Sequence, residues 1–370
     1  MDKPDPSRDD ISLALAVDIG GTKVAAALVD DRGSLVPGST ARAATGGVGD
    51  AAGLTRNIVG VVRDVLGAVP RGGRIVGVGI GSAGPVDLVR GAVSPKNLPT
   101  LERFPIADVI AQAVRVERAG CAKRGDDIRD VPVVLRLDGT CIALAERWRG
   151  ANRGARHSMA IVVSTGVGGG IILDGAVVSG ASGNAGHIGQ LRLRPADAGG
   201  PSDAGTLEGI AAGPRTVAWA RRRGWLGQTG EHLAESYADG DPIARAAVRR
   251  SAEAVGLAIS NVTTLLDLEA VAIGGGFANV APDYVDLVRV AAEENALFPY
   301  ASAVTIRPTG LAGDGPLIGA AALIHRSSDV ALRSEPGRAH PDRSGSADRV
   351  GQERDDVGVH AVVERRAVEA

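Results

Sequence analysis

Hydrophobic residues occur along the chain at two spacings, and each spacing predicts a different kind of element. Short apolar runs typical of buried strands cover residues 12–17, 23–29, 33–36, 74–80, 132–137, 159–164, 171–178 and 269–273. Apolar residues at helical spacing predict helices over residues 54–66, 106–116, 243–266, 283–294 and 316–325. Strands that alternate with helices indicate an α/β fold.

One pattern, a strand followed by a glycine turn and a second strand, occurs twice. It appears first around Gly20-Gly21 and again around residues 165–170, and the two units lie 146 positions apart (164 minus 18). Such a repeat suggests a duplicated α/β domain, in which each half presents a glycine hairpin to a shared cleft. Chance recurrence of a common hairpin is the alternative.

Length and composition exclude several classes of protein. The chain has 370 residues, enough for two domains, and its 43 acidic and 41 basic residues nearly cancel, so no nucleic-acid partner is expected. The sequence has no apolar run of membrane-spanning length and no signal-peptide pattern, so we expect a cytoplasmic protein without a membrane partner. Cys121 and Cys141 are isolated, which fits a reducing compartment. The polar composition of residues 328–370 predicts a disordered tail.

The first glycine hairpin carries the strongest chemical signal. Consecutive glycines at Gly20 and Gly21 let backbone amides approach phosphate oxygens. Asp18 ends the first strand and could hold a hydrated magnesium ion, while Thr22 and Lys23 could donate to phosphates. The alternative is a plain hairpin with solvated polar side chains.

Two further glycine turns follow predicted strands. Each is weak alone, because glycine runs also end strands for steric reasons. Three such turns at strand ends are more informative together, since α/β proteins bind ligands at the carboxyl ends of parallel strands. The candidate nucleotide-binding residues in these two turns are Thr165, Gly166, Gly168, Gly274, Gly275 and Gly276.

Asp138 follows the predicted strand 132–137 and opens a predicted helix. Aspartate is a favoured N-cap residue, and that role alone could explain its position. The functional alternative is a general base that takes a proton from a hydroxyl as it attacks the γ-phosphate of ATP. Spacing does not decide between the two.

Three other polar residues could contact a substrate. His187 and Gln190 lie in a short glycine-rich segment, and Glu208 follows Gly205-Thr206-Leu207. Taken singly, each could equally be a turn residue or an exposed carboxylate at a helix start.

The order of these motifs resembles the ROK family (repressors, open reading frames and kinases) within the actin-like ATPase superfamily. The similar segments are 13–29, 79–87, 94–99, 163–178, 271–277 and 311–321. The resemblance extends from about residue 12 to residue 325 and therefore covers nearly all of the predicted ordered chain.

The resemblance implies two duplicated actin-like, ribonuclease H-like α/β domains that flank a nucleotide and sugar cleft. The expected domains are 12–137 completed by 315–327, and 138–314. It further implies ATP with magnesium, a hexose-like substrate, a homodimer, and Asp138 aligned with the family's catalytic base. The residues aligned with Asn97 and Glu208 contact sugar hydroxyls in the family's kinases.

The sequence departs from the family pattern in the sugar half. Leu137 stands where an asparagine usually precedes the catalytic aspartate, and His187-Ile188-Gly189-Gln190 replaces a Glu-x-Gly-His motif. The family's cysteine-rich zinc loop would fall on residues 199–206, which contain no cysteine, so structural zinc is not expected.

We therefore predict an ATP-dependent carbohydrate kinase that uses Asp138 as general base. The alternative is a catalytically weak or inactive regulator of the same family, which the changes at Leu137, His187 and Gln190 motivate. A DNA-binding repressor would need an N-terminal helix-turn-helix, and only about a dozen residues precede the first strand.

Overall fold

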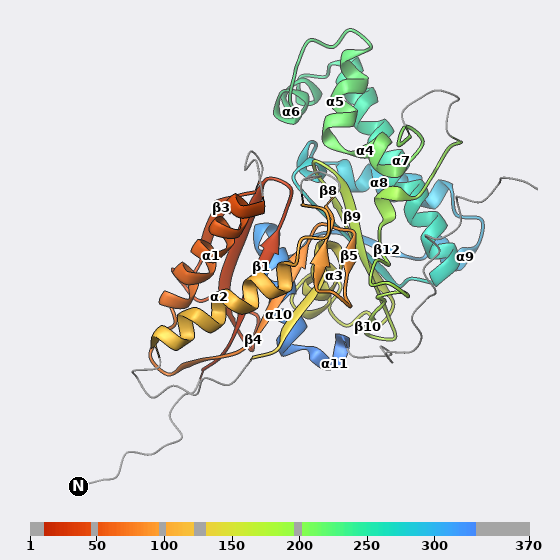
Figure 1. Ribbon diagram of the computed structural model, residues 1–370. Helices are drawn as coiled ribbons and strands as arrows, with labels where there is room; N and C mark the ends of the chain where they lie inside the picture. The colour runs from red at the N-terminus through yellow and green to blue at the C-terminus, as the bar shows by residue number, and fades with distance from the viewer. Residues whose placement is uncertain (1–10, 46–50, 96–100, 122–130, 196–201, 331–370) are drawn as a thin grey trace, which may run out of the picture. The chain divides into compact units, whose positions relative to one another are not determined.

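The computed structural model describes residues 11–45, 51–95, 101–121, 131–195 and 202–330, which form two five-stranded mixed sheets (Figure 1). In the first sheet the strand order β3-β2-β1-β4-β7 comprises Ala41–Ala44, Lys23–Asp30, Ile11–Ile19, Gly73–Ser82 and Val133–Leu137. In the second, the order β10-β9-β8-β11-β12 comprises Ala176–Val177, Val167–Leu173, Ser158–Val163, Ala270–Gly274 and Thr305–Pro308. Each sheet combines an antiparallel hairpin with two parallel strands in the same order, which confirms the predicted duplication.

The sequence of strand β1 is a continuous apolar run because the strand is buried on both faces. It lies at the centre of its sheet, between antiparallel β2 and parallel β4. Leu13, Leu15 and Val17 enter one hydrophobic cluster, whereas Ala14 and Ala16 enter another. A strand buried on both faces carries no polar alternation.

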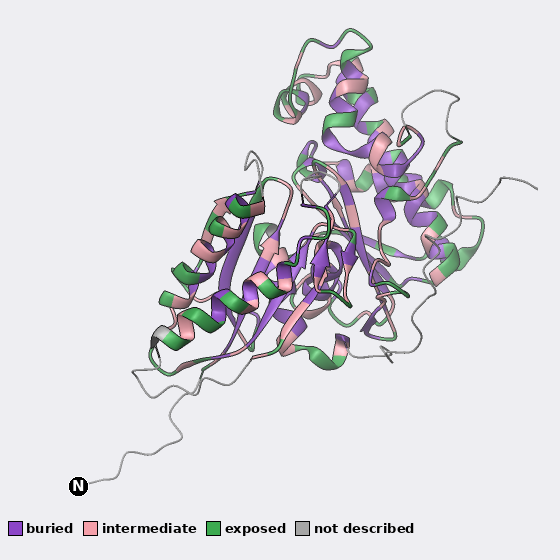
Figure 2. Cartoon of the chain, in the orientation of Figure 1, coloured by how far each residue is buried: buried purple, intermediate pink, exposed green. Residues whose placement is uncertain are grey.

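Helices cover both faces of the first sheet. The Leu13 face is covered by α1 (Ala51–Gly67) and α2 (Ile106–Cys121), whose apolar sides join the cluster of β1 and β4 and whose other sides carry the exposed residues (Figure 2). The opposite, alanine-rich face is covered by α3 (Asp138–Trp148) and α10 (Gly315–His325). Helix α10 therefore returns to the first sheet, and α11 (Ser327–Val330) follows it, so the prediction that a disordered tail begins at residue 328 is wrong for residues 328–330.

The second sheet carries its own helices and core. The core of this region joins β8, β9 and β11 to the long helix α7 and its neighbours. The helices between the strands of this region are α4 (Leu207–Ala211), α5 (Gly213–Arg221), α6 (Gly230–Ala238), α7 (Pro242–Leu266), α8 (Tyr284–Glu294) and α9 (Pro299–Ser302). A small hairpin of β5 (Val86–Asp87) and β6 (Ala92–Val93) follows β4. The domain boundaries given by the family resemblance stay a prediction.

The predicted strand at residues 33–36 is wrong. Residues 33–36 form no strand but contribute an isolated bridge from Leu35 to Val29, and β3 is the strand that pairs with β2 on the edge away from β1. The Asp30 carboxylate accepts hydrogen bonds from the N–H groups of Arg32 (3.0 Å) and Ser34 (2.8 Å). This side chain fixes a turn at the end of β2, so regular pairing resumes only further along the chain.

The second glycine hairpin is tighter than the sequence predicted. We expected a turn over residues 165–170, but β9 begins at Val167, so Gly168, Gly169 and Gly170 lie in the strand.

Among the described residues, no helix is long and apolar enough to cross a membrane.

Candidate active site

Asp18 and Asp138 lie at the same edge of the first sheet. Asp18 is near the end of β1 and pairs in register with Gly81 of β4, while Ser82 of β4 pairs with Leu137 at the end of β7. The three strands are parallel neighbours, so both carboxylates are at carboxyl ends, with the end of β4 between them. This is the edge at which α/β proteins bind ligands.

The two carboxylates are electrostatically coupled. Burial raises the pKa of Asp18 to about 7, helped by the negative charge of Asp138 and opposed by Lys23. Burial also raises the pKa of Asp138 to about 6, while the N–H of Gly139 lowers it. Two partly buried carboxylates with one nearby lysine leave negative charge that a divalent cation could neutralise. Among the described residues there is no group of three or more metal-ligating side chains that could hold an ion by itself.

The first glycine turn is held in shape by hydrogen bonds to its main chain. The N–H of Gly20 donates to the carbonyl of Lys23 (2.9 Å), and the hydroxyl of Thr45 donates to the carbonyl of Gly20 (2.8 Å). Thr22 and Lys23 have exposed side chains at the tip. Thr45 was not anticipated, because nothing in its local sequence links it to a turn 25 positions earlier.

Asp138 is not an N-cap. The cap of α3 is Leu137, and Asp138 is the first helical residue. Its carboxylate accepts a hydrogen bond from the N–H of the next residue, Gly139 (2.6 Å), rather than from a residue further into the helix. The interpretation of Asp138 as a capping residue is therefore wrong, and its burial requires another explanation.

The start of α3 lies directly against the second glycine hairpin. A β-carbon on Gly139 would come within 2.2 Å of the carbonyl oxygen of Gly169, and one on Gly170 within 2.3 Å of the carbonyl oxygen of Gly139. Glycine at these positions is required by the close backbone approach. The contact places Asp138 between the end of the first sheet and the strand that follows the second turn.

The third glycine turn lies beside the second. Strands β8 and β11 are parallel neighbours, so their carboxyl ends meet, and Gly274 pairs in register with Val162. Gly275 has a φ of +102°, and a β-carbon there would come within 2.3 Å of the Val163 carbonyl oxygen. The candidate residues of these two turns, Thr165, Gly166, Gly168, Gly274, Gly275 and Gly276, therefore come from adjacent strand ends.

Glu208 links the second glycine turn to the candidate sugar side. It lies in the first turn of α4, whose N-cap Thr206 accepts a hydrogen bond from the N–H of Gly209. One carboxylate oxygen of Glu208 accepts a hydrogen bond from the N–H of Val167 (3.0 Å), and the other accepts one from the side-chain amide of Gln190 (3.3 Å). The sequence identified Glu208 and Gln190 but not this connection, which spans 41 positions.

His187 lies in contact with the loop after β4. A β-carbon on Gly84 would come within 2.4 Å of Leu137 Cδ2 and 3.0 Å of His187 Cε1. Burial lowers the pKa of His187, and the negative charge of Glu208 raises it. Leu137 and His187 therefore both lie beside Gly84, and the charge of Glu208 acts on His187.

A second loop contact was missed by the sequence analysis. Asn184 accepts a hydrogen bond from the N–H of Val86 (2.8 Å) and donates one to its carbonyl (2.9 Å), which ties the segment before His187 to β5. Asn97, the other predicted sugar-binding residue, lies outside the described residues.

The segment where a zinc loop would fall is described from residue 202. Asp203 forms an ion pair with Arg215 (2.5 Å), and the carbonyl of Ser202 accepts a hydrogen bond from Arg192 (2.8 Å). These contacts hold residues 202–203 to α5 and to the segment before residue 196.

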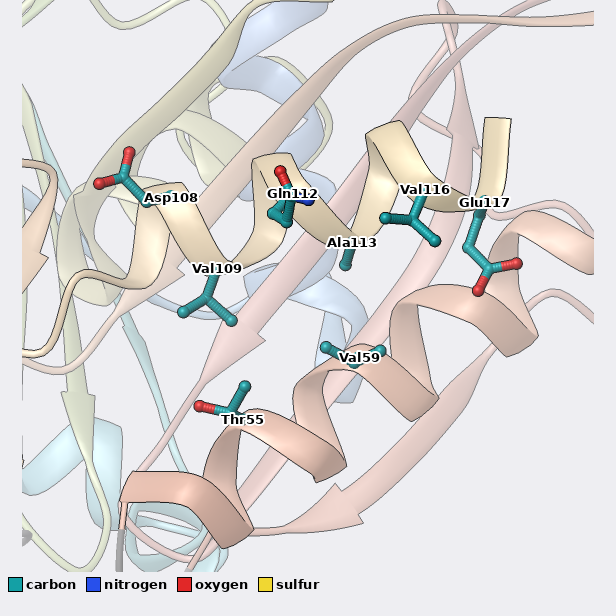
Figure 3. A pocket seen from close by; sticks show the side chains of 8 residues that line it. All are labelled: Thr55, Val59, Asp108, Val109, Gln112, Ala113, Val116 and Glu117. Atoms are coloured by element: carbon teal, nitrogen blue, oxygen red, sulfur yellow. The ribbon is translucent and has the colours of Figure 1, made fainter. Parts of the chain in front are cut away.

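A separate apolar groove lies between α1 and α2 (Figure 3). Its volume is about 380 Å³, and Val59, Val109 and Ala113 line its middle, with Asp108 and Glu117 toward its ends. None of the candidate site residues that the structure describes lines it.

The profile of the ROK family matches residues 14–327, which is most of the chain. The chain belongs to the ROK family. An N-acetylmannosamine kinase of Yersinia pseudotuberculosis is 32% identical over 309 residues, which cover 83% of this chain and 96% of that protein.

Solved ROK structures show the same fold. A ROK hexokinase from Thermus thermophilus is 29% identical with a TM-score of 0.69, and covers 85% of this chain and 99% of its own. A ROK family glucokinase from Streptomyces griseus, in complex with glucose and AMPPNP, is also 29% identical, with a TM-score of 0.70 and the same coverage. This ROK protein is thus related along nearly its whole described length to sugar kinases, and that relationship supports a kinase activity.

Proposed function

We propose that this ROK protein transfers the γ-phosphate of ATP to a hydroxyl of a hexose or an N-acetylhexosamine, with Asp138 as general base. The observation that carries the proposal is the position of Asp138. It lies partly buried at the edge of the first sheet, and the residue beside it lies against the second glycine hairpin. A hydroxyl held there would face phosphates gripped by the glycine turns.

The nucleotide half would be built mainly from main-chain groups. Amides of the turns at Gly20-Gly21 and at Thr165-Gly166 would donate to phosphate oxygens, and Lys23 would add a positive charge. Asp18 would hold a magnesium ion through water. A bound magnesium ion would neutralise charge on the β- and γ-phosphates.

Asp138 has the ionisation behaviour that a general base requires. With a pKa of about 6, it is mostly ionised at neutral pH and can still accept a proton. Glu208, Gln190, His187 and Asn97 would orient the sugar. Phosphoryl transfer needs no covalent intermediate with the protein. The protein therefore contributes to the rate mainly by orienting the reactants in this way.

We propose 2-acetamido sugars as the first class to test. The support comes from the Yersinia relative, which is named an N-acetylmannosamine kinase. The altered residues give a physical reason to expect selectivity. A site whose buried polar groups are matched to one sugar rejects analogues that leave those groups unpaired.

A regulator that binds nucleotide or sugar without turnover is the second candidate. Leu137 motivates it, because this fully buried apolar side chain stands where the family usually has an asparagine. Such a protein would bind ATP but release no ADP.

Release of ADP should be measured with Mg·ATP against hexoses, N-acetylhexosamines and polyols, with Asp138→Asn as the matched inactive variant. Sugar-dependent release that disappears in Asp138→Asn supports the kinase and names its substrate class. ATP binding without release for any sugar favours the regulator instead.

A further inference from the structure

Glu146 is a buried carboxylate that the proposed function does not use. It lies in the last turn of α3, and its residue is only 1% exposed. Within the part of the chain that the structure describes, it forms no ion pair with a basic side chain. Burial of a carboxylate costs free energy unless hydrogen bonds replace its contacts with water. The donors around Glu146 must therefore account for its position.

Three donors from two distant segments reach the Glu146 carboxylate. Oε2 accepts hydrogen bonds from the N–H groups of Ala151 (2.7 Å) and Gly310 (3.3 Å). Oε1 accepts one from the hydroxyl of Thr309, and that hydroxyl in turn accepts one from the N–H of Leu311 (3.2 Å). One carboxylate thus fastens the segment that follows β12 to the end of α3.

The segment that follows β12 lies beside the third glycine turn. Strands β12 and β11 are parallel neighbours, so their carboxyl ends meet. The N–H of Thr309 donates a hydrogen bond to the carbonyl of Ile273 in β11 (2.8 Å). A β-carbon built on Gly274 would come within 3.1 Å of Thr309 Cγ2. The Thr309 side chain therefore packs on the first glycine of this turn, while its hydroxyl is held by Glu146.

We propose that Glu146 is a positioning residue that acts through Thr309 to hold the third glycine turn in the shape that receives the nucleotide. The inference rests on the nucleotide site of the proposed function, but it does not require turnover. A main chain rich in glycine has many accessible conformations, so its neighbours must hold it in one of them. A turn that is ordered before the ligand arrives costs less free energy on binding.

An ordinary structural role at the end of α3 is the alternative. The hydrogen bond from Ala151 fits that role, since Ala151 follows the helix directly. The bonds from Thr309 and Gly310 do not, because these residues lie 163 and 164 positions further along the chain. The same helix begins at Asp138, so Glu146 also ties the element that carries the proposed base to the third glycine turn.

The test is a calorimetric titration of the full chain with Mg·AMPPNP, at a temperature well below the melting temperature of each variant. Glu146→Gln keeps the size of the side chain but replaces one acceptor oxygen with a donor. Thr309→Val keeps the shape of its side chain and removes the hydroxyl, whereas Thr309→Ser restores the hydroxyl. The control is Glu269→Gln, an exposed carboxylate that accepts the N–H of Arg156 (3.1 Å) just before β11, at the opposite end of that strand.

We expect the dissociation constant for Mg·AMPPNP to rise about tenfold in Glu146→Gln and in Thr309→Val, the order of magnitude for loss of a hydrogen bond to a charged group. It should change by less than about threefold in Thr309→Ser and in Glu269→Gln. If Glu146→Gln does not fold, the comparison of Thr309→Val with Thr309→Ser decides the question.

An unchanged dissociation constant in Glu146→Gln and Thr309→Val, with a lower melting temperature, overturns the inference and leaves Glu146 as a structural residue of α3. Equal weakening in Glu269→Gln also overturns it, because that result indicates general destabilisation. ADP release by the wild type tests the kinase separately. A wild type that binds Mg·AMPPNP but releases no ADP with any sugar contradicts the kinase and leaves the inference standing. A wild type that does not bind Mg·AMPPNP contradicts both.

Discussion

The nucleotide half and the sugar half of the candidate site are built in different ways. The nucleotide half consists of three glycine turns at strand ends, and its shape comes from main-chain hydrogen bonds such as those at Gly20. The sugar half consists of side chains from separate segments, in which Glu208 contacts Gln190 and His187 meets Leu137 beside Gly84. A site made of backbone tolerates sequence change, whereas a site made of side chains changes its ligand when those residues change. The departures that the family resemblance implies, at Leu137, His187 and Gln190, would all belong to the sugar half.

The largest effect is expected from a substitution of Asp138, which lies where the nucleotide half meets the sugar half of the candidate site. Asp138→Asn keeps the size of the side chain but removes the base, so we expect kcat to fall by about a thousandfold or more, within the range typical of general-base catalysis. Nucleotide affinity should change by less than about threefold, because the glycine turns are untouched. Steady-state kinetics and nucleotide titration measure the two effects. An equal loss of nucleotide affinity would show that Asp138 belongs to the nucleotide half instead.

A single added methyl group should disrupt the contact between the start of α3 and the second glycine hairpin. In Gly139→Ala the new β-carbon would lie 2.2 Å from the carbonyl oxygen of Gly169, so we expect a loss of about 1–3 kcal/mol in the free energy of unfolding. Helix propensity alone would predict a gain of up to about 1 kcal/mol for this change. Denaturant unfolding therefore distinguishes the two explanations by sign.

Gly168→Ala is the matched control for that prediction, because no atom lies within 4 Å of a β-carbon built there. Its stability should equal that of the wild type within about 0.5 kcal/mol. A similar loss in both variants would mean that the hairpin is sensitive to any side chain, and that the contact with α3 is not special.

The sugar half can be probed through Glu208. Glu208→Gln retains the shape of the side chain but removes the charge that accepts hydrogen bonds from Val167 and Gln190. We expect the KM for the sugar to rise about tenfold, the order of magnitude for loss of a charge-assisted hydrogen bond. Glu235→Gln, an exposed carboxylate on α6, is the control and should leave both KM values unchanged. If the KM for ATP rises more than the KM for the sugar, Glu208 acts chiefly through the second glycine hairpin.

The smallest expected effect is on pH dependence. If Asp138, with a pKa of about 6, must be ionised, kcat/KM should fall about fourfold between pH 7.5 and pH 5.5 as the carboxylate takes up a proton. A flat profile over this range would contradict the role of Asp138 as base.

Ionisation of Asp138 should raise the activity of the protein but lower the stability of its folded state. The pKa of Asp138 in the folded protein lies above the ordinary aspartate value of 3.8, so this group favours folding most below pH 3.8, and that contribution is lost as the pH rises through about 6. Asp138→Asn should therefore raise the melting temperature of the ligand-free protein relative to wild type at pH 8, with a smaller difference at pH 5. Thermal unfolding at the two pH values measures this, and a variant less stable than wild type at pH 8 would contradict the sign.

The contrast between glycine turns and side-chain contacts also explains which features could be predicted from the sequence. Most of the strands and the duplicated order follow from local apolar runs, and the sequence predicted them. It did not predict the short strands β3 and β12, and it predicted too long a second glycine turn. The strand at residues 33–36 was wrong because one carboxylate, that of Asp30, fixes a turn that hydrophobicity does not reveal. The meeting of Glu208 with Val167, and of His187 with Leu137 beside Gly84, depends on tertiary contacts between distant segments. No spacing rule encodes them.

The most direct test of the central claim follows the γ-phosphate itself. Phosphorus NMR of the wild-type protein with Mg·ATP and N-acetylmannosamine, and then with glucose, distinguishes transfer to a sugar from simple hydrolysis. We expect a new phosphomonoester resonance that grows with the loss of the γ-phosphate signal for at least one sugar of these classes, and that is absent with Asp138→Asn. Conversion of ATP to inorganic phosphate alone, or bound but unreacted ATP with every sugar of the panel, would contradict it.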